Sequence, residues 1–111
     1  METRDAKGRT TLAWACYQGH ERVAEWLIGN GASVTTLDVE QMSPLHWAAI
    51  KGNYHAAKVL ISAGASSMLD VKDAVDNKTP EELARMKASK AKNERDKERY
   101  LEVANYLDRH K

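Results

Sequence analysis

The sequence predicts an all-α solenoid in which antiparallel helix pairs stack side by side and are joined by β-turn fingers. The first observation is a repeat, because segments 5–37 and 38–70 align without a gap at a period of about 33 residues. The second is that apolar residues within each segment follow helical spacing. A unit this short cannot bury its apolar face alone, so several units must stack against one another. Identical residues recur at Asp5/Asp38, Leu12/Leu45, Trp14/Trp47, Ala15/Ala48, Gly19/Gly52, Ala24/Ala57, Leu27/Leu60, Ile28/Ile61, Gly31/Gly64, Ala32/Ala65 and Ser33/Ser66.

The first helix of the second segment is expected to begin at Ser43-Pro44-Leu45-His46. Ser43 can cap free amide groups, and Pro44 occupies the first helical position, where its missing N–H costs nothing. Gly52 is expected to end this helix at a tight turn. The second helix takes its apolar face from Ala56, Ala57, Leu60 and Ile61 and ends at Gly64.

Residues 31–42 have no helical periodicity and form the predicted finger between two pairs. At this point the residues resemble the ankyrin repeat, through Ser43-Pro44-Leu45-His46, Ala48-Ala49-Ile50-Lys51-Gly52 and Gly64-Ala65. The resemblance covers 5–69 and rests on several spacings that agree twice. It implies a module that binds other proteins on the concave surface of its fingers and first helices.

The remainder of the chain is predicted to be an altered third repeat, so that 1–111 is a single domain with repeats at 5–37, 38–70 and 71–111. Thr79-Pro80-Glu81-Glu82 is a capping box, and Asn77 can adopt the left-handed conformation expected at Gly8. A charged insertion at 87–99 contains no Gly or Pro and has Lys90/Glu94 and Lys92/Asp96 at helical spacing. We therefore expect extended helices and a polar cap at this end.

Composition excludes several classes of function. The 111 residues carry a formal net charge of +1, so no global field indicates nucleic acid or an anionic membrane. The basic residues of the insertion alternate with acidic ones and favour a solvated helix over nucleic-acid binding. No stretch is apolar enough for membrane insertion, and one cysteine permits no internal disulfide. We expect an intracellular protein of the cytoplasm or nucleus.

No constellation of catalytic or metal-binding residues is evident. Cys16 aligns with Ala49 on the buried face, and His20 and His46 occupy positions where the resemblance implies structural roles. One cysteine and four separated histidines give no paired-ligand spacing for a metal. The expectation is a protein that is not an enzyme and needs no cofactor.

The candidate binding surface is the concave one implied by the resemblance. The part of this surface in the second repeat is unusually apolar, since it contains Val39, Met42 and Ile50. The repeat pattern does not require apolar residues at these three positions. An exposed apolar cluster usually marks a contact site, although packing between repeats is the simpler role for the two tryptophans. The partner-binding residues predicted here are Arg9, Trp14, Tyr17, Gln18, Val39, Glu40, Met42, Trp47, Ile50 and Lys51.

Two alternatives remain open at this level. Ala15-Cys16-Tyr17-Gln18-Gly19-His20 and 45–53 are similar to the repeats of ankyrin-bearing acyltransferases that attach palmitate, in which the repeats recruit substrate proteins. The Asp-His-His-Cys motif of that family is absent from this sequence, so the chain would be at most a recruitment part. The other alternative is a structural or self-associating assembly element, against the expectation of a monomer.

Overall fold

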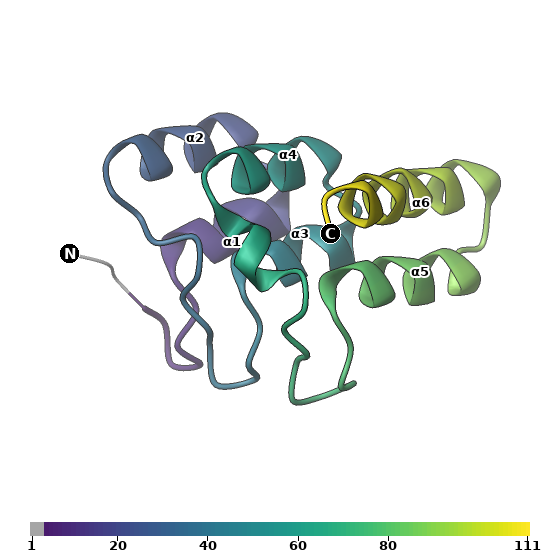
Figure 1. Ribbon diagram of the computed structural model, residues 1–111, viewed down its shortest axis with the longest axis horizontal. Coiled ribbons are helices and arrows are strands. Elements are labelled where there is room, and N and C mark those ends of the chain that lie inside the picture. The colour runs from purple at the N-terminus through teal and green to yellow at the C-terminus, as the bar shows by residue number, and fades with distance from the viewer. Residues whose placement is uncertain (1–3) are drawn as a thin grey trace.

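The computed structural model describes residues 4–111, and its helices form two rows (Figure 1). One row contains α1 (Thr11–Gln18), α3 (Pro44–Lys51) and α5 (Pro80–Lys90). The other contains α2 (Glu21–Gly29), α4 (Tyr54–Ser62) and α6 (Glu94–Arg109). The loops between pairs extend as fingers from the edge of the first row. The predicted all-α solenoid is confirmed for the described residues.

The helices of the first row begin and end as the sequence predicts. Thr10, Ser43 and Thr79 each accept a hydrogen bond from the backbone amide three residues later, and Thr79 and Glu82 form the expected capping box. Gly19 and Gly52 end α1 and α3 at φ values of 76° and 66°. These left-handed positions are accessible to glycine without a Cβ clash.

The core lies between the two rows and is built mostly from leucine and alanine. The alanines let neighbouring helices approach closely, and the leucines fill the space between pairs. Leu60, on α4, is completely buried. The largest aliphatic side chains that are fully buried are Leu12, Leu45, Leu60, Leu83, Leu107 and Val103.

Each finger is a closed turn that starts at an aspartate. The backbone amide of Asp5 donates to Arg9, that of Asp38 to Met42 and that of Asp73 to Lys78, over 3.0–3.1 Å between N and O. The third turn is one residue longer than the others. The remaining two extra residues of this finger precede Asp73, on the side where a short 3₁₀ helix, η1 (Ala65–Met68), forms.

Adjacent fingers are also joined through their backbones. The amide of Val39 donates to the carbonyl of Lys7 over 3.0 Å, and the amide of Ala74 donates to the carbonyl of Glu40 over 2.8 Å. Both bonds join the residue after one aspartate to the second residue after the preceding aspartate. The three fingers therefore keep one register despite the longer third turn.

The same position of each finger has a left-handed backbone. Gly8 has φ 76°, Asn77 has φ 54° as predicted, and Gln41 has φ 61°. Asparagine tolerates this conformation, whereas glutamine has neither the small size of glycine nor the local hydrogen bonding of asparagine. Gln41 is therefore a point of backbone strain.

Replacing Gln41 with glycine is expected to raise the free energy of unfolding by about 0.5–1 kcal/mol, because relief of the strain exceeds the entropy that glycine adds to the unfolded chain. Denaturant titration measures this change. Gln18→Gly, at the end of α1, is the matched control and should lower stability instead. A loss of stability in Gln41→Gly would show that the glutamine side chain makes stabilising contacts.

The charged insertion contributes to two long helices, α5 with 11 residues and α6 with 16. A turn at 91–93 separates them, so the expected ion pairs Lys90/Glu94 and Lys92/Asp96 do not form in the described structure. Instead Asn93 caps α6 by accepting from the amide of Asp96 over 2.8 Å. The correction follows from competition, because an asparagine at this position favours a new helix start over a continuous helix.

The third pair places a buried carboxylate where the other two have leucine. Glu81 lies two residues after its helix cap, as Leu12 and Leu45 do, and is 6% exposed. It forms ion pairs with Arg85, at 2.8 Å between Nε and Oε2, and with Lys111. Burial opposes ionisation, but bonds from Lys111 and Arg85 outweigh it and lower the pKa of Glu81.

Candidate functional site

The aspartates at the start of the first two fingers hold those fingers in shape. Oδ1 of Asp38 accepts the backbone amides of Glu40 and Met42 at 2.8 and 3.0 Å. Oδ1 of Asp5 accepts those of Lys7 and Arg9 at 2.9 and 3.0 Å. Each carboxylate therefore fixes the conformation of its finger from inside the turn.

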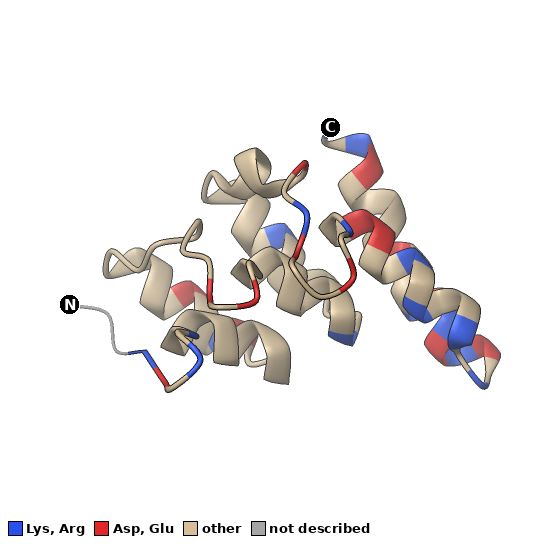
Figure 2. Cartoon of the chain, turned by 90° about the horizontal axis from the view of Figure 1, so that it is seen from below, with Lys and Arg blue, Asp and Glu red and all other residues tan. Residues whose placement is uncertain are grey.

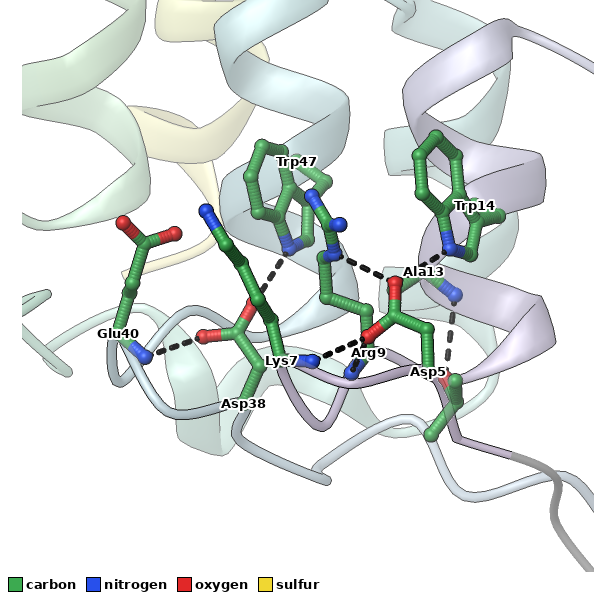
Figure 3. A network of polar contacts seen from close by, with 9 residues as sticks. Asp5, Lys7, Arg9, Ala13, Trp14, Asp38, Glu40 and Trp47 are labelled. Carbon is green, nitrogen blue, oxygen red and sulfur yellow. Dashed lines mark hydrogen bonds and ion pairs between the residues drawn. The ribbon is translucent and has the colours of Figure 1, made fainter.

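The second oxygen of each carboxylate holds a tryptophan. Oδ2 of Asp5 accepts from Nε1 of Trp14 at 2.9 Å, and Oδ2 of Asp38 accepts from Nε1 of Trp47 at 3.0 Å (Figure 3). Partial desolvation would raise the pKa of Asp5, but the bonds from Arg9, Trp14 and Lys7 lower it to about 2. The first and second fingers are thus each tied to their own first-row helix, α1 and α3, through a carboxylate.

The tryptophans belong to a set of rings that crosses from one helix to the next. Tyr17 meets Trp14 and Trp47 edge to face, with centroids 5.9 and 5.3 Å away. The guanidinium carbon of Arg9 lies 4.6 Å from the centroid of Trp14 and 5.8 Å from that of Trp47. Nζ of Lys51 lies 5.0 Å from the centroid of Tyr17. We call this set, Arg9, Trp14, Tyr17, Trp47 and Lys51, the aromatic groove.

The aromatic groove is a preformed surface outside the hydrophobic core. Arg9, Trp14, Tyr17 and Trp47 line a small concavity, of about 10 Å³, together with the buried Ala13. The side chains of these four residues are only partly buried. Edge-to-face and cation–π contacts hold the rings in one arrangement. The sequence-predicted residues of this groove are therefore brought together, and aromatic and cationic surface remains available.

The other predicted residues are placed differently. Gln18 is exposed at the end of α1, and Glu40 and Ile50 are half-buried. Val39 is 66% exposed at the tip of its finger. Met42 is only 5% exposed, so the predicted exposed cluster of Val39, Met42 and Ile50 loses its central member. The turn closes on Met42, whose amide binds Asp38, and this carries the side chain inward.

His46 joins two repeats in a neutral form. Its Nδ1 accepts from the backbone amide of Ser43 at 3.1 Å, so Nε2 carries the proton and donates to the carbonyl of Val71 at 2.8 Å. Desolvation lowers the pKa of His46, although the bond to Val71 and the charges of Asp73 and Asp38 oppose that shift. Protonation of Nδ1 would break the bond to Ser43.

We expect the free energy of unfolding to decrease as the pH is lowered, because of His46. Since the pKa of His46 in the folded state lies below the ordinary value of 6.5, the folded state binds fewer protons than the unfolded one. Its contribution is complete above about pH 6.5 and is lost as the pH falls toward the folded pKa. Denaturant titrations at about pH 7.5 and 5.5 measure this effect. Between these two pH values, His46→Gln, which retains a capping acceptor, should lose less free energy of unfolding than the parent. Equal losses would contradict this assignment.

A comparison with known families agrees with the geometry. A family model described as "Ankyrin repeats (many copies)" matches residues 12–61. These residues are ankyrin repeats. The segment that contains α1 to α4 thus belongs to a class of protein-interaction module. Among curated proteins, the chain is similar to Palmitoyltransferase AKR1 of Saccharomyces cerevisiae, with 46% identity over 44 residues. That alignment covers 40% of this chain and 6% of the yeast protein.

A reactive cysteine, a metal site and a membrane span each have requirements that can be compared with the described residues. Cys16 is completely buried, and burial raises the pKa of its thiol to about 12. No group of three or more His, Cys, Asp or Glu side chains within the described range could hold a metal ion. Over the same residues, no helix is both long and apolar enough to cross a membrane.

Sequence reasoning missed the residues that position the aromatic groove. Asp5 and Asp38 recur at the repeat spacing, which was the available signal, but a recurring aspartate indicates no specific role by itself. Asn53 was also missed. Its Nδ2 donates to the carbonyls of Cys16 and Tyr17 and so satisfies the end of α1 from the next repeat.

Proposed function

We propose that this chain is a non-catalytic interaction module that binds a partner protein or a linear motif across the aromatic groove and the finger tips. Support comes from the ankyrin repeats at 12–61 and from the arrangement of Trp14, Tyr17 and Trp47. Binding energy at protein interfaces concentrates in a few aromatic and arginine side chains. The groove presents both types of residue in one fixed arrangement.

The observation that carries this proposal is that the rings lie outside the buried core. The buried core cluster is formed by leucines and alanines together with Cys16 and Val103, and it does not include Trp14, Tyr17 or Trp47. Side chains of this size on a surface supply large contact areas with little entropy to lose. We assign Val39, which is exposed on its finger, and the half-buried Ile50 of α3 to the apolar part of the binding surface, and Gln18, Glu40 and Lys51 to its polar part.

Selection of displayed peptides against the domain tests the proposal. Tyr17→Ala and Ile50→Glu are each expected to weaken binding of the selected peptides by about 10-fold or more. Val23→Glu is the matched control, because Val23 is 47% exposed on α2, in the other row of helices. Its affinity should equal that of the parent. Melting temperatures of all three variants must stay close to that of the parent.

Two results would contradict the proposed groove. Equal binding by the parent, Tyr17→Ala and Ile50→Glu would place the contact elsewhere on the molecule. Loss of binding in Val23→Glu alone would move it to the open face of α2. Failure to enrich any peptide would favour a folded partner in place of a linear motif, and would remove the linear-motif part of the proposal.

A second candidate is recruitment of substrate proteins for an acyltransferase. It is supported by the similarity to Palmitoyltransferase AKR1, whose matched part is 6% of that protein. Both candidates use the same groove, so the peptide variants test them together. Association of the chain with an acyltransferase in cells would favour recruitment.

A monomeric state is part of the proposal. Trp26 is 66% exposed beside Val23 on α2, which makes this helix the alternative surface for self-association. Sedimentation velocity over a range of concentrations distinguishes the two states. A sedimentation coefficient that rises with concentration in the parent and stays constant in Trp26→Glu would establish the assembly element instead.

A further inference from the structure

We propose that the occupant of the aromatic groove is an acidic segment of the partner, whose Asp or Glu carboxylate is bound by Arg9. The inference rests on the proposed function and specifies the chemistry of the partner. It depends on the unused hydrogen-bonding groups of Arg9 and on the balance of charge around them.

The guanidinium of Arg9 is fixed but only partly used. Its Nε donates to Oδ2 of Asp5 at 2.8 Å, and the group lies between the rings of Trp14 and Trp47, as Figure 3 shows. Within residues 4–111, neither of its terminal nitrogens takes part in a hydrogen bond. Two terminal nitrogens held in a fixed plane match the two oxygens of a carboxylate. The cost of ordering the arginine has already been met in the free protein.

The charges around Arg9 also favour an anion. Lys7 is exposed on the same finger as Arg9, and Lys51 is exposed on α3 beside Tyr17. Asp5 and Asp38 direct their oxygens to backbone amides and indoles, so their capacity to bind a cationic partner is reduced. Glu40 is the acidic residue predicted for this surface whose carboxylate has no such partner. Basic residues outnumber acidic ones along the ribbon of the first finger (Figure 2), whereas the second finger contributes Asp38 and Glu40. An anion is therefore favoured at the first finger, around Arg9.

A carboxylate fits this environment better than a phosphate. The ion pair with Asp5 already offsets much of the positive charge of Arg9. A dianionic phosphate would face the Asp5 carboxylate at close range, whereas a single negative charge meets less repulsion. Aromatic or aliphatic neighbours of the acidic residue in the partner would contact Tyr17 and Trp47.

The test uses random displayed peptides of about 12 residues, which when extended span about 40 Å. The domain measures 39 Å along its longest axis, so such peptides can cross all three fingers. Selections run in parallel on the parent, Arg9→Gln and Arg22→Gln. The control removes an exposed arginine from α2 and changes the net charge equally. We expect enrichment of Asp and Glu with the parent and with Arg22→Gln, and none with Arg9→Gln.

Affinities of the selected peptides, made synthetically, complete the test. Binding can be followed by tryptophan fluorescence in Trp26→Phe, which leaves only the two groove tryptophans. Arg9→Gln should bind at least about 10-fold more weakly, and Arg9→Lys should bind with intermediate affinity because it lacks the fork. Replacing the peptide's Asp and Glu by Asn and Gln should abolish the difference between the parent and Arg9→Gln. If Arg9→Gln folds poorly, two other measurements replace it. Lys51→Gln should bind the acidic peptides more weakly than the parent, and the affinity of the parent should fall as the ionic strength rises.

Three outcomes overturn the inference. Peptides that bind through Tyr17 and Trp47 without acidic residues would exclude the acidic segment while leaving the proposed function in place. No enrichment by the parent would remove both the inference and the linear-motif function. Tighter binding of a phosphoserine form of the peptide, by about 10-fold or more, would assign the groove to phosphorylated segments.

Discussion

Replacing Leu60 with alanine is expected to lower the free energy of unfolding by about 2–5 kcal/mol. Leu60 lies on α4 in the middle pair and is completely buried within the core cluster that joins all three pairs. Its removal leaves a cavity that close-packed neighbours can fill only in part. In a solenoid each pair depends on its neighbours, so the loss should affect the whole stack. Thermal and denaturant unfolding measure it.

Val23→Ala is the matched control for this prediction. Val23 occupies an exposed position of α2, and shortening it should change stability by no more than about 0.5 kcal/mol. A loss below about 1 kcal/mol in Leu60→Ala would show that the core relaxes around the deletion. Separate transitions in the mutant would show that the pairs unfold independently.

Replacing Asp38 with alanine is expected to lower the free energy of unfolding by about 2–4 kcal/mol, because two backbone amides and one indole lose their hydrogen-bond acceptor at once. Asp38 is 6% exposed, so water can replace these bonds only in part. Its finger and Trp47 should both lose their fixed positions. We therefore expect weaker peptide binding as well, measured with the same peptides as the groove variants, and a changed fluorescence of Trp47.

Two variants separate the carboxylate geometry from charge. Asp38→Asn retains one acceptor oxygen and should lose less stability than Asp38→Ala. Asp70→Ala removes an equally charged but exposed residue, and its stability should stay within about 0.5 kcal/mol of the parent. Equal losses in Asp70→Ala and Asp38→Ala would show that net charge, and not the finger, determines the effect.

Local rules account for the part of the fold that the sequence predicts correctly. Ser43 and Thr79 cap helices, Gly19 and Gly52 end them, and apolar spacing selects the faces that are buried. These effects act within a few residues and repeat at the same spacing, so each repeat checks the other. The left-handed conformation of Asn77 follows from the same alignment with Gly8.

The groove required information that no local rule provides. Met42 is apolar and lies at a position that the repeat pattern leaves free, but whether it is exposed depends on how the finger closes on Asp38. The approach of Arg9 to two tryptophans from different repeats depends on the stacking distance between α1 and α3. The break at 91–93 does not follow from pair spacing, because the capping of α6 by Asn93 outweighs the ion pairs that a continuous helix would allow.

The hydrogen bonds between adjacent fingers join three separate loops into one surface with fixed spacing. The amide of Val39 is held by the carbonyl of Lys7 although its side chain is largely exposed, so it should exchange with deuterium far more slowly than a typical loop amide. The fingertips then cannot slide past one another to suit a ligand. A segment that crosses them meets chemical groups at intervals set by the stack, and it is selected by the spacing of its residues as well as by their kind.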